Sequence, residues 1–379
     1  MSTNYENLKN WILNSGLIIS NKDDENLGGV YSFYDESQKK YSFLYPEITG
    51  YTISALSFLY EIEQNDSYLE KGIASFRWLK KIFKQYGGIV QGINDSDRQR
   101  KKLAYSFDTA ICSKGLLDLY QITNDKEILQ TATQFTDWMI ESIDSDGSMM
   151  PYMNLDEKKF HEKNNVWYKQ KGCLHIKTCM PLLQLYTITH EEKYKNLAES
   201  ICNNFKNFQN EDGSFLIHKN TKTINLHTQA YAVEGLLFAY NVTKNPEYLE
   251  SCKIALKWCI SNIENDGSIR LWFNFKDQSK AMYPIAQIIR LLSLVQKIDE
   301  SLDYQKPMDN LMKFLLSLQA QSNDIRINGG FYEEYFKSLF GWKKRLKLNS
   351  WGSLFALQAL YWYENSDKIK FETSITKLY

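Results

Sequence analysis

Six segments of the chain each begin with polar side chains and then become almost wholly apolar. The polar openings carry Glu47 with Tyr51, Asp108, His175 with Lys177, His227 with Gln229, Tyr283, and Asn349 with Trp351. Carboxyl, imidazole and phenol groups are the ones that enzymes use as general acids and bases. The pattern therefore predicts acid–base chemistry, provided that the fold brings the six openings together.

The apolar parts of these segments predict six buried helices. They lie at 45–60, 105–120, 172–186, 226–240, 282–295 and 348–363. The fourth segment, LHTQAYAVEGLLFAY, has small residues at Ala230, Ala232, Gly235 and Ala239, which let neighbouring helices approach closely. A helix that is apolar nearly all round is a buried helix.

A second set of predicted helices, each with one charged face, alternates with the buried set. These helices lie at 5–14, 69–85, 127–143, 192–209, 248–263 and 306–318. After each comes a turn glycine, at intervals of about sixty residues, where φ > 0 is expected. The six turn glycines are Gly29, Gly88, Gly147, Gly213, Gly267 and Gly330, each followed by a short extended piece.

The repeat consists of an outer helix, a glycine turn, a hairpin-like loop and an inner helix. Six such units without a distinct capping repeat fit a closed ring better than an open solenoid. We therefore predict an all-α (α/α)6 toroid with short β-hairpin-like loops at one face. We expect residues 1–379 to form a single domain.

Closure of the ring would bring the openings of all six inner helices to one end of the barrel. The loops carry Tyr31, Tyr152, Tyr332, Glu333 and Glu334 toward the same end. We therefore predict that the openings line one pocket, the deepest in the molecule, with a roof made by the loops around Tyr152 and 332–335.

From this arrangement we assign candidate roles. The candidate catalytic residues are Glu47, Asp108, His227 and Glu333. The candidate substrate-binding residues are Tyr51, His175, Tyr283, Glu334, Asn349 and Trp351. Of His175 and Lys177, which are too close in sequence to share a helix face, we expect His175 to point inward.

Each candidate has a structural alternative. Asp108 follows Ser106 at a helix start, where both residue types are ordinary caps. Glu47 follows Pro46, a common first-turn pair, and His227 could be a hydrogen-bonded core histidine. Glu333 and Glu334 could belong to a solvated loop. Glu234, in the middle of an apolar helix, is interpreted as the buried partner of a basic residue.

Composition excludes several function classes. Forty-five basic residues balance forty-five acidic ones, so we expect no nucleic-acid partner. No apolar run approaches the length of a membrane span, and the N-terminal segment lacks the pattern of a signal peptide. Six scattered cysteines indicate reduced core thiols. We therefore expect a cytoplasmic protein.

We expect neither a metal nor any other cofactor. Cys173, His175 and Cys179 are residue types that bind zinc, but their spacing does not put two ligands on one helix face. The chain also has no Gly-rich phosphate loop and no GxSxG elbow. The acidic clusters of terpene synthases are missing as well.

The GG and DGS turns and the segments YPEITGY, FDTAICSKGLL and LNSWGSLFALQAL resemble a group of bacterial and archaeal (α/α)6-barrel proteins. That group is related to six-hairpin glycosidases, to glucuronyl C5-epimerase-like proteins and to terpenoid-cyclase toroids. The resemblance covers nearly the whole chain and implies an association with polysaccharide biosynthesis and its assembly proteins. Fold by itself does not identify a reaction.

Two classes of function remain open at this point. The first is a carbohydrate-active enzyme that acts on an acidic oligosaccharide or polysaccharide. Paired carboxylates would make it a glycoside hydrolase, whereas His227, His175 and Tyr283 could support uronate epimerisation or elimination. The second is a non-catalytic glycan-binding or scaffold protein in cell-surface polysaccharide assembly.

Overall fold

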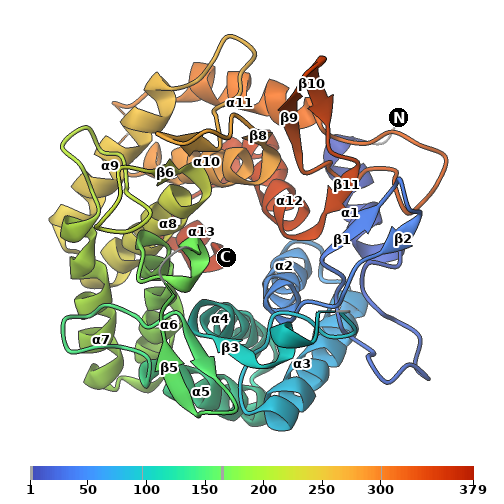
Figure 1. The fold of residues 1–379 in the computed structure, drawn as a ribbon, viewed down its shortest axis with the longest axis vertical. Helices are drawn as coiled ribbons and strands as arrows, with labels where there is room; N and C mark the ends of the chain where they lie inside the picture. Colours follow the sequence, from blue (N-terminus) through green and yellow to red (C-terminus); the bar gives the residue numbers. More distant parts are fainter. Residues whose placement is uncertain (1–2, 96, 164–165, 300) are drawn as a thin grey trace.

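The computed structural model describes residues 3–95, 97–163, 166–299 and 301–379. Helices form a closed ring in which an inner layer alternates along the chain with an outer layer (Figure 1). The inner helices are α2 (Pro46–Glu63), α4 (Ser106–Thr123), α6 (Cys179–Thr189), α8 (Leu226–Thr243), α10 (Met282–Val295) and α12 (Ser350–Glu364). The predicted (α/α)6 toroid is confirmed.

The outer layer consists of the helices that the sequence marks as amphipathic. They are α1 (Asn4–Asn14), α3 (Asp66–Tyr86), α5 (Lys126–Ile140), α7 (Glu192–Asn203), α9 (Pro246–Ser261) and α11 (Gln305–Ser317). Each outer helix buries one face, whereas the inner helices are buried nearly all round, as α8 illustrates with 14 buried residues. Among the described residues, no helix is both long and apolar enough to cross a membrane.

Short strands lie at one end of the ring, on the loops between outer and inner helices. They are β1 (Phe33–Asp35), β2 (Lys40–Tyr41), β3 (Leu103–Tyr105), β4 (Tyr152–Asn154), β5 (Lys159–His161), β6 (Ile224–Asn225), β7 (Trp272–Phe273), β8 (Lys280–Ala281), β9 (Glu334–Ser338), β10 (Gly341–Lys344) and β11 (Lys347–Asn349). The antiparallel pair β1–β11 joins the first repeat to the last, with Phe33 opposite Asn349. This pairing, together with packing of α12 on α1 and α2, closes the ring.

The turn glycines are predicted correctly at the three DGS turns and shifted by one residue at the three GG turns. Positive φ occurs at Gly28, Gly87 and Gly329, the first glycine of each pair. The second glycine packs against a tryptophan of an outer helix. At Gly330, for example, an added Cβ would lie 2.6 Å from Cε2 of Trp11. The first glycine therefore supplies the turn, and the second leaves space for the indole ring of the tryptophan.

The third inner segment begins differently from the predicted continuous helix. Residues Cys173–Thr178 form a 3₁₀ helix, and α6 starts only at Cys179. Pro181 explains the change, because it has no N–H to donate to the carbonyl four residues earlier, at Lys177. The regular α-helical ladder therefore cannot extend back through this opening.

The C-terminal segment turns back into the ring. It contains a 3₁₀ turn (Ser366–Lys368), α13 (Phe371–Ser374) and a second 3₁₀ turn (Ile375–Lys377). Figure 1 shows this end of the chain near the centre of the ring. The Tyr379 side chain is buried, and its hydroxyl donates to the carbonyl of Leu354 at 2.8 Å.

Glycines let α2 and α4 approach at backbone distance. A Cβ added to Gly115 would lie 2.3 Å from the carbonyl oxygen of Gly50, far inside van der Waals contact. The obstacle is backbone, which cannot rotate away as a side chain can. These two glycines therefore set the spacing of the helices that carry Glu47 and Asp108.

We expect Gly115→Ala to lower the free energy of unfolding by about 2 kcal/mol, because overpacking against backbone outweighs the higher helix propensity of alanine. Gly72→Ala in α3 is the matched control. Its Cβ would meet only the Leu119 side chain, at 3.3 Å, so its stability should be equal or higher. Urea unfolding of both variants tests this, and equal losses would contradict it.

Candidate active site

A cavity of about 330 Å³ lies at the openings of the inner helices. Its lining combines two carboxyl groups, a histidine and many aromatic rings. The lining residues are Tyr45, Glu47, Gln91, Arg100, Tyr105, Phe107, Asp108, Pro151, Trp167, Tyr168, Leu174, His227, Tyr231, Tyr283 and Trp351. Concave, largely apolar sites with a few convergent polar groups are typical of ligand pockets.

Five of the predicted site residues line this cavity together. They are Glu47, Asp108, His227, Tyr283 and Trp351, and they come from five different inner helices. Each is the second or third residue of its helix and therefore lies in the first turn. The closed ring therefore brings together residues that are up to about three hundred positions apart in the sequence.

The other predicted site residues are not part of the cavity lining. Tyr51 is buried one turn deeper in α2, where its hydroxyl lies 3.1 Å from that of Tyr231. Asn349 is the N-cap of α12, and its side-chain oxygen accepts from the N–H of Gly352 at 2.8 Å. Tyr51 therefore contacts a residue of the lining, and Asn349 caps the helix that carries Trp351.

Glu333 and Glu334 also lie outside the lining, because an arginine holds them in the β9–β11 region. Glu334 forms an ion pair with Arg345 at 2.7 Å, and Glu333 lies 3.7 Å from the same guanidinium. Burial and the neighbouring Glu334 raise the pKa of Glu333 to about 7. Of the two loops predicted to roof the pocket, the one around Tyr152 contributes Pro151 to the lining, whereas residues 332–335 contribute nothing to it. The lining also includes Gln91, Arg100, Trp167 and Tyr168 from other loops.

The prediction that His175 rather than Lys177 points into the barrel is wrong. The amine of Lys177 lies 2.6 Å from Glu234 and over the rings of Tyr51 and Tyr231. A fully buried carboxylate needs a cation, and the long lysine side chain can reach it. The His175 ring is buried, with its centroid 6.4 Å from that of Phe107, and it is not among the residues that line the cavity.

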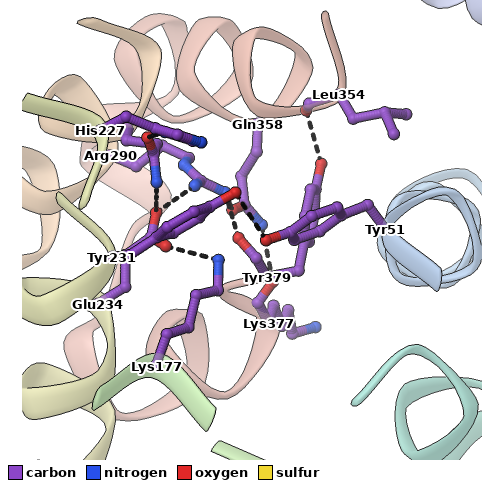
Figure 2. Close-up of polar contacts among 11 residues, drawn as sticks. Tyr51, Lys177, His227, Tyr231, Glu234, Arg290, Leu354, Gln358, Lys377 and Tyr379 are labelled. Atoms are coloured by element: carbon purple, nitrogen blue, oxygen red, sulfur yellow. Dashed lines mark hydrogen bonds and ion pairs between the residues drawn. The ribbon is translucent and has the colours of Figure 1, made fainter. Parts of the chain in front are cut away.

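The interpretation of Glu234 as a buried ion-pair partner agrees with the structure. Figure 2 shows its carboxylate between Lys177 and Arg290. Arg290 approaches it at 2.5 Å, and all three side chains are fully buried. Removing one member of such a cluster leaves an uncompensated buried charge, which costs roughly 3–5 kcal/mol.

Sequence reasoning missed the aromatic residues that flank the openings. Tyr45 and Tyr105 immediately precede α2 and α4, and both line the cavity. Their shared place before an inner helix is a signal that comparison of the repeats could have found. Trp167 and Tyr168 lie in a long connecting loop with no such signal.

Glu47 and Asp108 form an electrostatically coupled pair. Burial raises the pKa of Glu47 to about 7, opposed by the Tyr45 hydroxyl and by the charge of Lys177. Burial, and then the charge of Glu47, raise the pKa of Asp108 well above its ordinary value. Two nearby carboxyl groups in a dry site cannot both ionise easily. We infer that Asp108 remains protonated at pH values at which Glu47 is already ionised.

His227 is neutral for the same physical reason. Burial lowers the pKa of its imidazole to about 3, and the nearby Lys177 and Arg290 contribute. Its Nδ1 lies 2.5 Å from the side-chain oxygen of Gln287. The rings of Tyr231 and Tyr283 pack against it, with centroids 4.1 and 4.7 Å away.

The cysteines serve packing between helices. The thiol of Cys173 lies 3.7 Å from the carbonyl of Thr228, and that of Cys179 lies 3.3 Å from the carbonyl of Gly235. All six cysteines are free and buried. In the described ranges of the chain, no group of three His, Cys, Asp or Glu side chains is arranged to hold a metal ion.

The raised pKa of Glu47 makes stability depend on pH. Its pKa is 4.5 ordinarily and about 7 in the folded protein. Between these values the folded state binds more protons than the unfolded chain, so stability falls as pH rises through this window. The loss is about 3 kcal/mol, at 1.36 kcal/mol per pKa unit.

We therefore expect Glu47→Gln to gain stability relative to the parent protein as the pH is raised from 5 to 8. Urea unfolding at both pH values measures the difference. Glu70→Gln, on the exposed face of α3, is the control and should show no such gain. A Glu47→Gln profile parallel to the parent would contradict the raised pKa.

Comparison with solved structures shows the same fold in several sugar enzymes. Cellobiose 2-epimerase from Bacillus thermoamylovorans B4167 is 16% identical, with a TM-score of 0.75 over 92% of this chain and 97% of that chain. Unsaturated glucuronyl hydrolase from Bacillus sp. GL1 is 14% identical, with a TM-score of 0.69 over 95% of this chain and 97% of that one. At these identities the likeness establishes the fold alone.

A comparison with curated proteins found no match. One family of protein sequences, described as beta-L-arabinofuranosidase, GH127 catalytic domain, matches residues 34–265. This match covers more than half of the chain, including α2, α4 and α8 with Glu47, Asp108 and His227. The chain therefore belongs to the beta-L-arabinofuranosidase, GH127 catalytic domain family, a family of carbohydrate-active enzymes.

Proposed function

We propose that the cavity hydrolyses a glycosidic bond, with Asp108 as general acid and Glu47 as general base. The observation that carries the proposal is the coupled pair itself. The carboxyl groups of half-buried Glu47 and buried Asp108, on adjacent inner helices, share one aromatic-lined cavity, and both pKa values are raised. Paired carboxyl groups with unlike protonation are the machinery of glycoside hydrolysis.

In this mechanism the protonated Asp108 donates its proton to the glycosidic oxygen as the bond from that oxygen to the anomeric carbon breaks. The ionised Glu47, near the positive charge of Lys177, takes a proton from the water that attacks the anomeric carbon.

The cavity walls suit a sugar substrate. Aromatic rings such as Trp351, Tyr283 and Trp167 offer apolar faces to pyranose or furanose rings. Arg100 at the wall, which also pairs with Asp95 at 3.0 Å, could bind a sugar carboxylate. The family description makes a beta-L-arabinofuranoside the first substrate to test, and an acidic oligosaccharide is the second.

A second candidate reaction is epimerisation or elimination on a uronate, with His227 and Tyr283 as the proton-transferring groups. It is favoured by the neutral imidazole beside the phenol, at 4.7 Å between ring centroids. Structures with this fold include a cellobiose 2-epimerase. An association with polysaccharide-assembly proteins and a cytoplasmic location are further predictions of the sequence.

We expect Asp108→Asn to reduce kcat for hydrolysis by about 10²–10⁴-fold, the scale of losing a general acid, with sugar affinity retained. Asp118→Asn is the matched control. Asp118 lies near the opposite end of α4, is also buried and pairs with Lys114 at 2.5 Å. It should lose stability and keep kcat. Sugar binding without turnover in the parent protein would support the glycan-binding alternative.

The pH profile tests the assigned base. Because Glu47 must be ionised, kcat/KM should fall as the pH drops below about 7, and Glu47→Gln should be nearly inactive.

Reaction in D2O separates the two candidate reactions. Hydrolysis leaves deuterium out of the carbon skeleton, whereas epimerisation through a carbanion introduces it next to the carboxylate. Deuterated product that is lost in His227→Gln and kept in Asp108→Asn would replace the hydrolytic assignment with the epimerase one.

A further inference from the structure

A chain of buried contacts runs from Glu234 to His227. The carboxylate of Glu234 accepts from Lys177 at 2.6 Å and from Arg290 at 2.5 Å. It also accepts from the side-chain amide nitrogen of Gln287 at 3.1 Å. The other end of the Gln287 amide lies 2.5 Å from Nδ1 of His227. Figure 2 shows the Glu234 end of this chain and the His227 ring above it.

The charge of Glu234 determines how the Gln287 amide lies. A carboxylate between two cations is ionised and can only accept hydrogen bonds. The NH₂ group of Gln287 must therefore face Glu234, since the opposite orientation would set oxygen against oxygen. The amide oxygen of Gln287 then faces His227 and can only accept.

This orientation decides which ring nitrogen of His227 carries the proton. Burial keeps the imidazole neutral by lowering its pKa to about 3, so one nitrogen is protonated and the other has a lone pair. Nδ1 faces an obligatory acceptor and must be the donor. Nε2, on the opposite edge of a ring that lines the cavity, keeps its lone pair.

We propose that Glu234 and Gln287 are positioning residues that hold the proton of His227 on Nδ1, so that Nε2 accepts a hydrogen bond from a hydroxyl group of the sugar. We call the hydrogen-bonded chain from Glu234 through Gln287 to His227 the relay. It fixes the tautomer of the histidine, because the hydrogen bond that one ring nitrogen makes decides which nitrogen carries the proton. The role of Nε2 toward a sugar rests on the proposed function, whereas the tautomer itself does not.

The relay selects substrates by chemistry. A sugar hydroxyl can donate to the Nε2 lone pair, whereas a carboxylate or a carbonyl would set two lone pairs against each other. The part of the sugar that faces α8 therefore carries a free hydroxyl. Any carboxylate of an acidic substrate lies elsewhere, and Arg100 is the cation of the lining that could receive it.

Nitrogen-15 NMR of protein with labelled histidine tests the relay without substrate. The chain has five histidines, and His227→Gln assigns the signal. We expect a protonated Nδ1 and an unprotonated Nε2, unchanged between pH 5 and 8. A proton on Nε2 in the parent protein, or titration in this range, would overturn the proposal.

Gln287→Met removes the amide at nearly constant volume. We expect the proton to move at least partly to Nε2, and KM to rise about 2–12-fold, as for the loss of a net 0.5–1.5 kcal/mol hydrogen bond, with a smaller change in kcat. Gln358→Met is the matched control, because Gln358 is equally buried and accepts from Arg290 at 3.0 Å. It should leave both the tautomer and KM unchanged.

An unchanged tautomer in Gln287→Met would also overturn the proposal. If Gln287→Met does not fold, the spectrum and pH series of the parent protein still decide the tautomer. If the protein hydrolyses no glycoside, the proposed function fails while the spectrum still decides the relay, so the two failures are distinguishable.

Discussion

The inner barrel depends on the ion pairs that the fully buried carboxylate of Glu234 forms. An isolated charge at this depth would be too costly to retain, and the structure compensates it with Lys177 and Arg290. Arg290 in turn donates to Gln358 and to the carbonyl of Tyr379. One ion cluster therefore ties α8 to the opening of the third inner segment, to α10, to α12 and to the C-terminal segment.

The same cluster determines the charge state of the cavity above it. Lys177 interacts with Glu47 as well as with Glu234. Two cations can therefore be balanced by two ionised carboxylates, Glu234 and Glu47. Burial and the charge of Glu47 both oppose a third negative charge on Asp108 and raise its pKa. In the proposed mechanism, this difference in protonation gives the two carboxyl groups of the cavity their different roles.

Backbone geometry brings the two carboxyl groups together. Gly50 and Gly115 let α2 and α4 approach more closely than any side chain would allow. Each helix begins at the cavity, and Glu47 and Asp108 line it from the first turns of the two helices. The strand pair β1–β11 joins the first and last repeats at this end of the ring.

Much of the fold could be predicted from the sequence, because its signals are local. The sixty-residue repeat, the glycine turns and the alternation of amphipathic and apolar helices all follow from residue order alone. The positions of Glu47, Asp108 and His227 in the cavity follow from the same pattern, since a closed ring must gather its helix openings at one end.

Tertiary structure alone decided which polar residues face the cavity and in what charge state. The choice between His175 and Lys177 depended on a carboxylate fifty-seven residues beyond Lys177 in the sequence. Glu333 and Glu334 lie beside Arg345, which follows β10, and no periodicity of the sequence indicates this contact. Local sequence determines the backbone position of a side chain. Its contacts and its protonation depend on desolvation and charge pairing, to which every neighbouring element contributes.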